Sequence, residues 1–282
     1  MSKKNITDAL KSFDEKYYTL RYPATTISAF GVAMKQYLFE IKQAAAGNLS
    51  EEHIKNITNA FLTKQLYSDD SFSINTENNI DSTIRFDGKL YALIEAKRPS
   101  NKNEMVTIDN INKKALWEIV YYYLSQTRDT SGAKVQRIRD VEIRRLIVTD
   151  SIQWFLIDAT DIENLCDGYL ERHFYKYKNN LLNYANDTAK FYEDIGTHLA
   201  KSDITKKLPF VFFDMEAEFK VRKNWQYLYK ILSGEYLLKF GYKQLIKTHK
   251  LNDKFYQELL YIMGLKEAKE MSNQSERHLQ SS

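Results

Sequence analysis

The sequence is poor in cysteine, proline and glycine. Cys166 is its only cysteine, which excludes an internal disulfide framework and a cysteine zinc cluster and agrees with a reducing compartment. The five histidines show no spacing typical of metal ligands. Three prolines and nine glycines among 282 residues leave few points at which a helix is broken. We therefore expect long helices joined by short connections.

Long apolar runs are also missing. No stretch approaches the about 18 apolar residues of a membrane-spanning helix, and the first residues, MSKKNITDAL, lack the apolar core of a secretion signal. We expect a cytoplasmic protein that has no membrane partner. The formal net charge of +4 is too small to indicate nucleic-acid binding by itself. Any DNA-binding surface has to come from local clusters of basic side chains.

The patterns that are present predict an α/β fold. Apolar residues recur at helical spacing over 26–46, 50–66 and 110–127, whereas 71–75, 82–86 and 90–97 are rich in β-branched and aromatic residues. Two further strand-like runs follow at 144–150 and 153–159. A three-stranded meander followed by a helical crossover predicts a mixed sheet flanked by helices. We expect this core to occupy residues 1–160.

The remainder of the chain has mostly helical patterns. We expect a C-terminal helical lobe or connector over residues 161–267. The last residues, 268–282, are polar and lack aromatic side chains, so we expect a flexible tail.

The stretch IDSTIRFDGKLYALIEAKRPSN, residues 80–101, contains the candidate site. Asp87-Gly88 is a strong signal for a two-residue hairpin turn, and the hairpin brings Asp81 alongside Glu95. Strand alternation places Glu95 and Lys97 on one face. A simple two-residue turn would nevertheless put Asp81 and Glu95 on opposite faces. The two carboxylates can share a face only if the hairpin contains a bulge or a bend.

Two neighbouring carboxylates followed by a lysine suit metal-dependent hydrolysis of a phosphodiester. Adjacent carboxylates raise each other's proton affinity unless a cation neutralises them, and oxygen ligands of this kind suit Mg²⁺. Lys97 could orient the attacking water or offset the charge that grows on the phosphate. An E-x-K triplet alone is common, and an ion pair between Lys97 and Glu95 is the simpler explanation.

Asp81 and the triplet Glu95-Ala96-Lys97, within this order of helices and strands, resemble the PD-(D/E)xK nuclease core. The resemblance implies that Asp81, Glu95 and the Ala96 carbonyl bind Mg²⁺, for which Mn²⁺ substitutes, while Lys97 assists the water. A glutamate from the preceding helix adds to this site in many members.

Glu51 is the better-placed candidate for that glutamate, because it lies at the edge of the apolar face of its helix, and Glu52 is the second. Glu118 would support the site from the next helix. All three have an alternative explanation. Acidic residues favour the first turn of a helix in any case, and Glu118 could belong to a solvated face.

Several blocks, among them SEEHIKN, LIEAKRPSNKNEM and LPFVFFD, resemble in order and spacing the N-terminal nuclease region of type IIG restriction-modification enzymes. This resemblance spans roughly residues 50–267. It implies double-stranded DNA as substrate and a methyltransferase and a target-recognition domain as partners, in a longer chain or as separate subunits. S-adenosylmethionine would act only through that methyltransferase, whose motifs are missing from this sequence. Cutting both strands would need a second nuclease copy, in a transient dimer on DNA, or two successive nicking events.

The loop after the triplet is the candidate DNA contact. Arg98, Ser100, Asn101 and Lys102 would meet a phosphate backbone there, although a solvated loop explains them too. Two other functions fit the same fold. One is a catalytically silent DNA-docking or interaction module, and the other is a DNA repair nuclease that shares the core.

Overall fold

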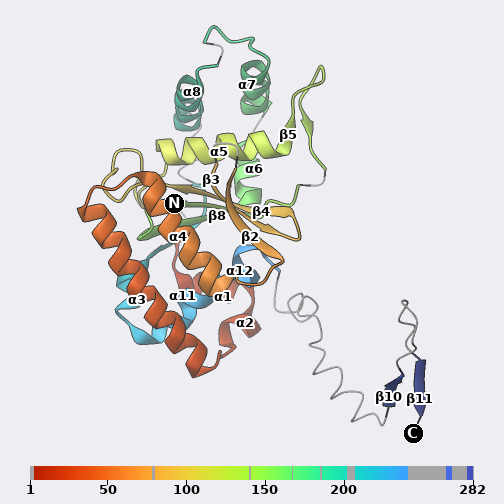
Figure 1. The fold of residues 1–282 in the computed structure, drawn as a ribbon. Helices are drawn as coiled ribbons and strands as arrows, with labels where there is room; N and C mark the ends of the chain where they lie inside the picture. Colours follow the sequence, from red (N-terminus) through yellow and green to blue (C-terminus); the bar gives the residue numbers. More distant parts are fainter. Residues whose placement is uncertain are drawn as a thin grey trace. The chain divides into compact units, whose positions relative to one another are not determined.

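A computed structural model describes residues 3–77, 80–139, 141–166, 168–184, 186–201, 207–240, 265–268 and 278–281 (Figure 1). The chain divides into two units, Met1–Lys239 and Phe240–Ser282. The first unit contains a mixed sheet and its covering helices. In the second, β10 (Leu265–Ala268) pairs with β11 (His278–Ser281) in antiparallel fashion. Among the described residues, no helix is both long and apolar enough to cross a bilayer.

The sheet of the first unit has the order β1-β9-β8-β7-β4-β3-β2 in the described part of the chain. Its strands are β1 (Lys3–Lys4), β2 (Phe72–Glu77), β3 (Ile80–Phe86), β4 (Lys89–Ala96), β7 (Arg145–Thr149), β8 (Gln153–Asp158) and β9 (Phe210–Asp214). Strands β4 and β7 are parallel, as are β1 and β9, and the other neighbours are antiparallel. A short separate pair is formed by β5 (Arg128–Asp129) and β6 (Gln136–Arg137). The expected α/β class with a mixed sheet is confirmed.

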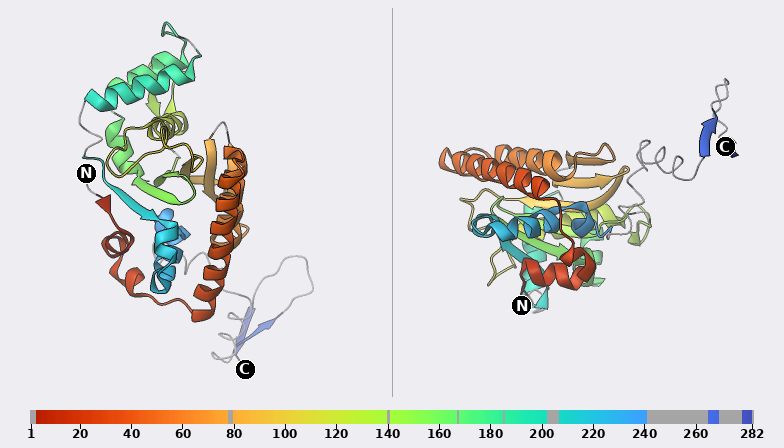
Figure 2. Two further views of the ribbon diagram at one scale, coloured as in Figure 1. Left: turned by 90° about the vertical axis from the view of Figure 1, so that its left-hand side faces the viewer. Right: turned by 90° about the horizontal axis from the view of Figure 1, so that it is seen from below.

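Helices lie on both sides of this sheet (Figures 1 and 2). They are α1 (Ile6–Phe13), α2 (Glu15–Thr19), α3 (Ala24–Ala46), α4 (Glu51–Leu66), α5 (Lys114–Thr127), α6 (Ala159–Leu165), α7 (Gly168–Lys178), α8 (Thr188–Lys201), α10 (Met215–Phe219), the 3-10 helix η1 (Arg222–Asn224), α11 (Trp225–Leu232) and α12 (Gly234–Leu237). Helix α5 packs on β4 and β7, and α7 and α8 lie beyond it. Helices α3 and α4 lie side by side, with α4 against β2 and β3.

Helix α5 makes the crossover that joins the parallel strands β4 and β7. Its residues Ala115, Leu116, Ile119, Val120 and Tyr123 recur at helical spacing and are all buried. They share one core with residues of β4, β7 and β8. A crossover helix is the usual way to connect parallel neighbours. This arrangement places the inner face of α5 over the end of β4.

A buried lysine of α11 binds α2 and the residue that follows it. Lys230 is fully buried, and its Nζ donates hydrogen bonds to the carbonyl oxygens of Tyr18 and Leu20, both at 2.7 Å. The hydroxyl of Tyr17 lies 2.7 Å from Oγ of Ser233 in the same region. The N-terminal segment is therefore tied to residues more than 200 positions later in the chain.

The structure differs from the expected division at residue 160. Strand β9 pairs with β8, and the first unit continues to Lys239, so residues 161–239 belong to the same unit as the sheet. Helices α6, α7 and α8 do follow the helical patterns. The reason for the difference is that β9 is a short apolar run, which periodicity alone does not distinguish from a buried piece of helix.

Two expectations concern the end of the chain. The part of the expected helical lobe over 241–264 lies outside the described residues. The segment 268–282, expected to be a flexible tail, contributes β11, which pairs with β10 from Leu265↔Ser281 to Ala268↔His278.

Candidate active site

The β3–β4 hairpin contains the bulge that the candidate site requires. Asp87 and Gly88 both have positive φ angles, 47° and 76°, as expected for a two-residue turn of the hairpin type. Beyond the turn, Leu90 pairs with Arg85, but Ala92 pairs with Ile84, so Tyr91 is an extra residue in β4. The bulge shifts the register of the remaining strand by one residue.

This shift brings Asp81 to Glu95. The pairs continue to Ser82↔Ile94, and the next step of the same register sets Asp81 across from Glu95. Oδ2 of Asp81 accepts a hydrogen bond of 2.8 Å from the amide of Ala96, which fixes the carboxylate at the end of β4. The two carboxylates that the sequence separates by a hairpin are therefore neighbours.

Lys97 lies between two buried carboxylates. Its Nζ is 2.6 Å from Oε1 of Glu95 and 2.6 Å from Oε2 of Glu118, which comes from α5. Glu95 is 1% exposed and Lys97 is 5% exposed. The ion pair between Lys97 and Glu95, which was the simpler explanation of the E-x-K triplet, is present. The same contacts also hold the amine beside the carboxylates of the candidate site.

Helix α4 brings Glu51 to the same place. Ser50 caps this helix, and its side chain accepts a hydrogen bond from the amide of His53. Oε2 of Glu51 accepts a hydrogen bond of 3.1 Å from the amide of Arg98, and Oε1 lies 3.9 Å from Nζ of Lys97. Glu51 thus contacts the residues that follow the strand.

Glu52 reaches the site only through a lysine. It forms an ion pair with Lys55, one turn further along α4, and most of its side chain is exposed. Nζ of Lys55 lies 3.6 Å from Oδ1 of Asp81. Lys55 is buried, and it is a residue of the site that sequence analysis missed. Its spacing of four from Glu51 places both on one helix face, which is the signal that could have identified it.

The electrostatics of the cluster favour a cation. Its carboxylates outnumber its ammonium groups: Glu51, Asp81, Glu95 and Glu118 surround Lys55 and Lys97. Burial raises the pKa of Glu95 well above its usual range, and the charge of Asp81 adds to the shift. Burial also raises the pKa of Asp81, against the opposing hydrogen bond from Ala96, and raises that of Glu51.

The pKa of Lys97 is also raised, and the cause is the neighbouring carboxylates. Burial alone would lower the pKa of Lys97, but the charges of Glu95 and Glu118 outweigh burial and raise it. The amine is therefore held as an ammonium group between the two carboxylates. It can stabilise negative charge, whereas it is poorly suited to accept a proton.

The oxygen atoms of the site fit a hard divalent cation. Oε2 of Glu95 is buried and has no hydrogen-bond partner among the described residues. Such an atom is costly unless something binds it, and Mg²⁺ takes oxygen ligands from one or two carboxylates. No three His, Cys, Asp or Glu side chains of the described ranges are arranged to hold a metal ion together. The fit thus rests on Asp81 and Glu95 with the Ala96 carbonyl, and Glu51 does not complete a three-carboxylate set.

The loop after β4 is only partly free to contact DNA. Nδ2 of Asn101 donates a hydrogen bond to Glu104 at 2.9 Å, so this side chain is engaged within the loop. Nζ of Lys102 lies 3.3 Å from Oδ2 of Asp150, yet its side chain is 69% exposed. Ser100 is exposed in a turn, and Arg98 is half-buried. Lys102 is therefore the clearest outward-facing cation of the four.

Asp150 is a second residue that sequence analysis missed. It is 1% exposed, and its Oδ1 accepts hydrogen bonds from the amides of Ile152 and Gln153 in the β7–β8 turn. The same turn is held by Tyr37, whose hydroxyl donates to the carbonyl of Ser151 at 2.7 Å. Because Lys97 N donates to the carbonyl of Thr149, this rigid turn adjoins the end of β4.

The fold and the site define an α/β protein with a buried acidic cluster and a central lysine at the carboxyl end of two parallel strands. The chain belongs to the family described as a domain of unknown function (DUF7149), whose model matches residues 7–245. No curated protein and no solved structure matches the chain.

Proposed function

We propose that this protein is a Mg²⁺-dependent endonuclease that hydrolyses phosphodiester bonds of double-stranded DNA. One observation carries the proposal. A bulge at Tyr91 places Asp81 across from Glu95, beside an ammonium group from Lys97, in the arrangement that the PD-(D/E)xK resemblance implies. The unpartnered Oε2 of Glu95 supports it, because that oxygen is available to a cation.

Each residue of the site would have its own role in phosphodiester hydrolysis. Asp81 and Glu95, with the Ala96 carbonyl, would hold the cation, and Ala96 N orients the Asp81 carboxylate through its hydrogen bond. The bound cation would polarise the phosphate and lower the pKa of a water molecule. Lys97, held as an ammonium group, would offset the negative charge that grows on the phosphate as water attacks phosphorus and the P–O bond breaks. Glu51 would position the loop after β4 through Arg98 N.

We also propose the setting, a type IIG-like restriction-modification system. The support is the order of sequence blocks described above; the family model covers most of that stretch, to residue 245, and assigns no function. Target recognition and methylation would then be supplied by other domains or subunits. One site of this kind cuts one strand, so cleavage of both strands would use a second copy or two successive nicks.

A plasmid-cleavage assay tests the activity. The full chain should nick supercoiled plasmid with Mg²⁺ or Mn²⁺ and should not do so with EDTA. Asp81→Asn, Glu95→Gln and Lys97→Met should each reduce the rate by about 100-fold or more, because each removes a group that acts on the reacting phosphate.

Asp87→Asn is the matched control for Asp81→Asn. Asp87 lies in the hairpin turn at positive φ, a conformation that asparagine also adopts, so this variant should cut at the normal rate. Equal cleavage by wild type and Asp81→Asn would point to a contaminating nuclease and would contradict the proposal.

A second function is favoured by the burial of the site. Glu95 and Lys97 are almost fully covered, which suits a catalytically silent module that docks on DNA. In that case a gel-shift assay should show DNA binding that is unchanged by Asp81→Asn and weakened by Lys102→Gln. Metal-dependent nicking that Asp81→Asn abolishes would exclude this alternative.

A further inference from the structure

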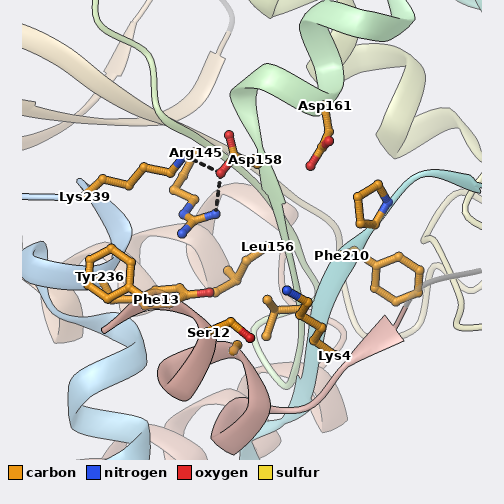
Figure 3. A pocket seen from close by; sticks show the side chains of 13 residues that line it. Lys4, Ser12, Phe13, Arg145, Leu156, Asp158, Asp161, Phe210, Tyr236 and Lys239 are labelled. Carbon is orange, nitrogen blue, oxygen red and sulfur yellow. Dashed lines mark hydrogen bonds and ion pairs between the residues drawn. The ribbon is translucent and has the colours of Figure 1, made fainter. Parts of the chain in front are cut away.

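A cavity lies at the end of β7 opposite the candidate active site (Figure 3). It has a volume of about 380 Å³ and is lined by residues of α1, β8, β9 and α12 together with Arg145, the first residue of β7. Arg145 pairs with Ala92, whereas Thr149 at the candidate active site pairs with Ala96. The cavity is therefore four residues away along the strand, roughly 13 Å. It is separate from the nuclease-like site.

Arg145 is a buried cation whose hydrogen-bonding capacity is largely unused. Its side chain is 8% exposed, and its guanidinium lies over the ring of Tyr236 at 4.6 Å. Nη1 donates to Oδ2 of Asp158 at 3.1 Å, and Nε is buried without a hydrogen-bond partner. A guanidinium has five N–H donors, and a buried one with so few partners calls for an explanation. An anionic group in the cavity would supply an acceptor for the outer N–H groups of the guanidinium.

Asp158 cannot be that acceptor, because it is already engaged. It accepts from Arg145, pairs with Lys239 and accepts hydrogen bonds from both the amide and the hydroxyl of Thr160. Asp158 therefore neutralises only part of the charge of Arg145 and Lys239. Its oxygens are already engaged, so it does not accept from Nε of Arg145.

Asp161 contributes a negative charge to the cavity, opposite in sign to that of Arg145. It lies in the first turn of α6 and has no hydrogen bond or ion pair to any described residue, and Figure 3 shows its carboxylate extending toward the cavity. Burial, and then the charge of Asp158, raises the pKa of Asp161, while the charges of Lys239, Arg145 and Lys4 oppose the shift. A carboxylate in this position is stabilised by a cationic group of a ligand.

Lys4 and the apolar wall complete the cavity. Lys4 comes from β1, lies across the cavity from Asp161 in Figure 3 and likewise has no partner among the described residues. The rings of Phe13, Phe210 and Tyr236 form much of the apolar lining. The cavity thus presents unsatisfied cations, one unsatisfied carboxylate and an aromatic wall. A complementary ligand carries an anionic group, a cationic group and an apolar body.

We propose that this cavity binds a free amino acid with an apolar side chain, its carboxylate toward Arg145 and Lys4 and its ammonium group toward Asp161. The volume suits a molecule of this size, since small-ligand sites begin at about 300 Å³. An amino-acid residue inside a polypeptide lacks the free ammonium and carboxylate groups on one carbon, so it does not match the charges of the cavity. The proposal is independent of the nuclease proposal, because no residue is shared between the two sites.

Calorimetric titration of the full chain with three matched probes tests it. L-phenylalanine carries both charged groups, phenethylamine lacks the carboxylate, and 3-phenylpropionate lacks the ammonium group. L-phenylalanine should bind about tenfold tighter than either analogue, because each analogue leaves one charged side chain without its partner. L-leucine serves as the probe with a smaller apolar body.

Two conservative variants, at the half-buried Asp161 and the exposed Lys4, locate the ligand. Asp161→Asn should weaken L-phenylalanine about tenfold and leave 3-phenylpropionate unchanged. Lys4→Gln should weaken L-phenylalanine and 3-phenylpropionate but not phenethylamine. Lys3→Gln is the control, because Lys3 lies over the ring of Phe212 and does not line the cavity.

Three results would overturn the proposal. One is that neither L-phenylalanine nor L-leucine binds at about 10 mM. Another is that the three phenyl probes bind equally, which would indicate an apolar hollow only. The third is that inorganic phosphate binds tighter than L-phenylalanine and is unaffected by Asp161→Asn, which would make the cavity an anion site.

Discussion

Asp81 and Glu95 are neighbours because β4 contains one residue more than β3 between the Asp87-Gly88 turn and the two carboxylates. Without Tyr91 as the extra residue in the pairing, Asp81 would lie across from Ile94. The pair is then further constrained by the Ala96 amide on one side and by Lys97 on the other. Predictions for the site depend on this pairing.

The site should bind Mg²⁺ in a pH-dependent manner. The pKa values of Asp81, Glu95 and Glu51 are raised in the folded protein. The metal-free protein therefore loses stability as pH rises above the ordinary carboxylate range, because ionising these groups costs more free energy in the folded state than in the unfolded state. A cation that binds the ionised carboxylates offsets this loss. Mg²⁺ should therefore raise the melting temperature more at pH 8 than at pH 5.

Glu95→Gln separates this effect from general salt stabilisation. The variant should show no Mg²⁺-dependent shift beyond that given by the same ionic strength of NaCl. For wild type, saturation at about 100 times Kd should add about 2.7 kcal/mol to the free energy of unfolding. An Mg²⁺ shift that is equal in both proteins would argue against a cation at these oxygens.

Lys55 should compete with the cation for Asp81. Its Nζ lies 3.6 Å from Oδ1 of Asp81, so Lys55→Met removes a positive charge from the edge of the site. Mg²⁺ affinity should rise several-fold, because the interaction of two like charges at this range is worth about 1 kcal/mol or more near a protein surface. Lys64→Met, in the last turn of the same helix, is the control, and calorimetric titration is the measurement. Weaker Mg²⁺ binding by Lys55→Met would mean that the lysine supports the site instead.

Lys230 should make stability rise with pH. Burial lowers the pKa of Lys230 to about 8, and the charge of Arg21 adds to the shift. In the unfolded chain a lysine has a pKa of about 10.4, so between these values unfolding takes up a proton and the folded state gains stability as pH rises. The slope is at most about 1.4 kcal/mol per pH unit. The hydrogen bonds to Tyr18 and Leu20 favour the ammonium form and should reduce it.

Urea unfolding at pH 7.5, 8.5 and 9.5 measures this slope. Lys230→Met should remove it, although the variant is less stable at every pH because two carbonyl groups lose their donor. The exposed Lys223 gives the matched variant, Lys223→Met, which should keep the slope of wild type. A slope shared by wild type and Lys230→Met would assign the titration to other groups.

Gly31 should not tolerate alanine. A Cβ atom at Gly31 would lie 2.0 Å from Cζ3 of Trp225, whose ring is stacked on Phe219 and whose Nε1 donates to the Phe219 carbonyl at 2.8 Å. The ring therefore cannot move away freely. Overpacking costs about 1–3 kcal/mol, which outweighs the gain of about 1 kcal/mol in helix propensity.

Gly132→Ala provides the comparison for Gly31→Ala. Its nearest neighbouring atom would be 3.9 Å away, so thermal unfolding should change little. Wild-type stability for Gly31→Ala would mean that α3 and α11 can separate at this point.

The local pattern of the hairpin was sufficient to predict much of the site. Asp87-Gly88 predicts the turn, and the alternation of β4 predicts that Glu95 and Lys97 share a face. The position of the bulge was not predictable, because Tyr91 is an ordinary strand residue and nothing in its chemistry marks it as extra. The need for a bulge nevertheless followed from the chemistry of the two carboxylates, and the register confirms it.

Long-range pairing explains the other differences. β1 has two residues and is a strand only because β9 lies beside it. Phe210–Asp214 is too short for the spacing of its apolar residues to distinguish a strand from a helix. Its partner β8 ends about 50 residues earlier in the chain. Lys55 was missed because its partner Asp81 lies on β3 and not on the same helix. Helix periodicity places Lys55 on the same face of α4 as Glu51, but it does not show which residue that face contacts.

The late arrival of β9 has a consequence for biosynthesis. When the ribosome has completed β8, that strand has no neighbour on its outer side, and its backbone amides and carbonyls can pair with any extended segment nearby. The partner Phe210–Asp214 emerges only after the segment that contains α6, α7 and α8 has been made. During this interval the nascent chain is open to association with other copies of itself, and chaperones that shield extended apolar segments would have their effect at this stage.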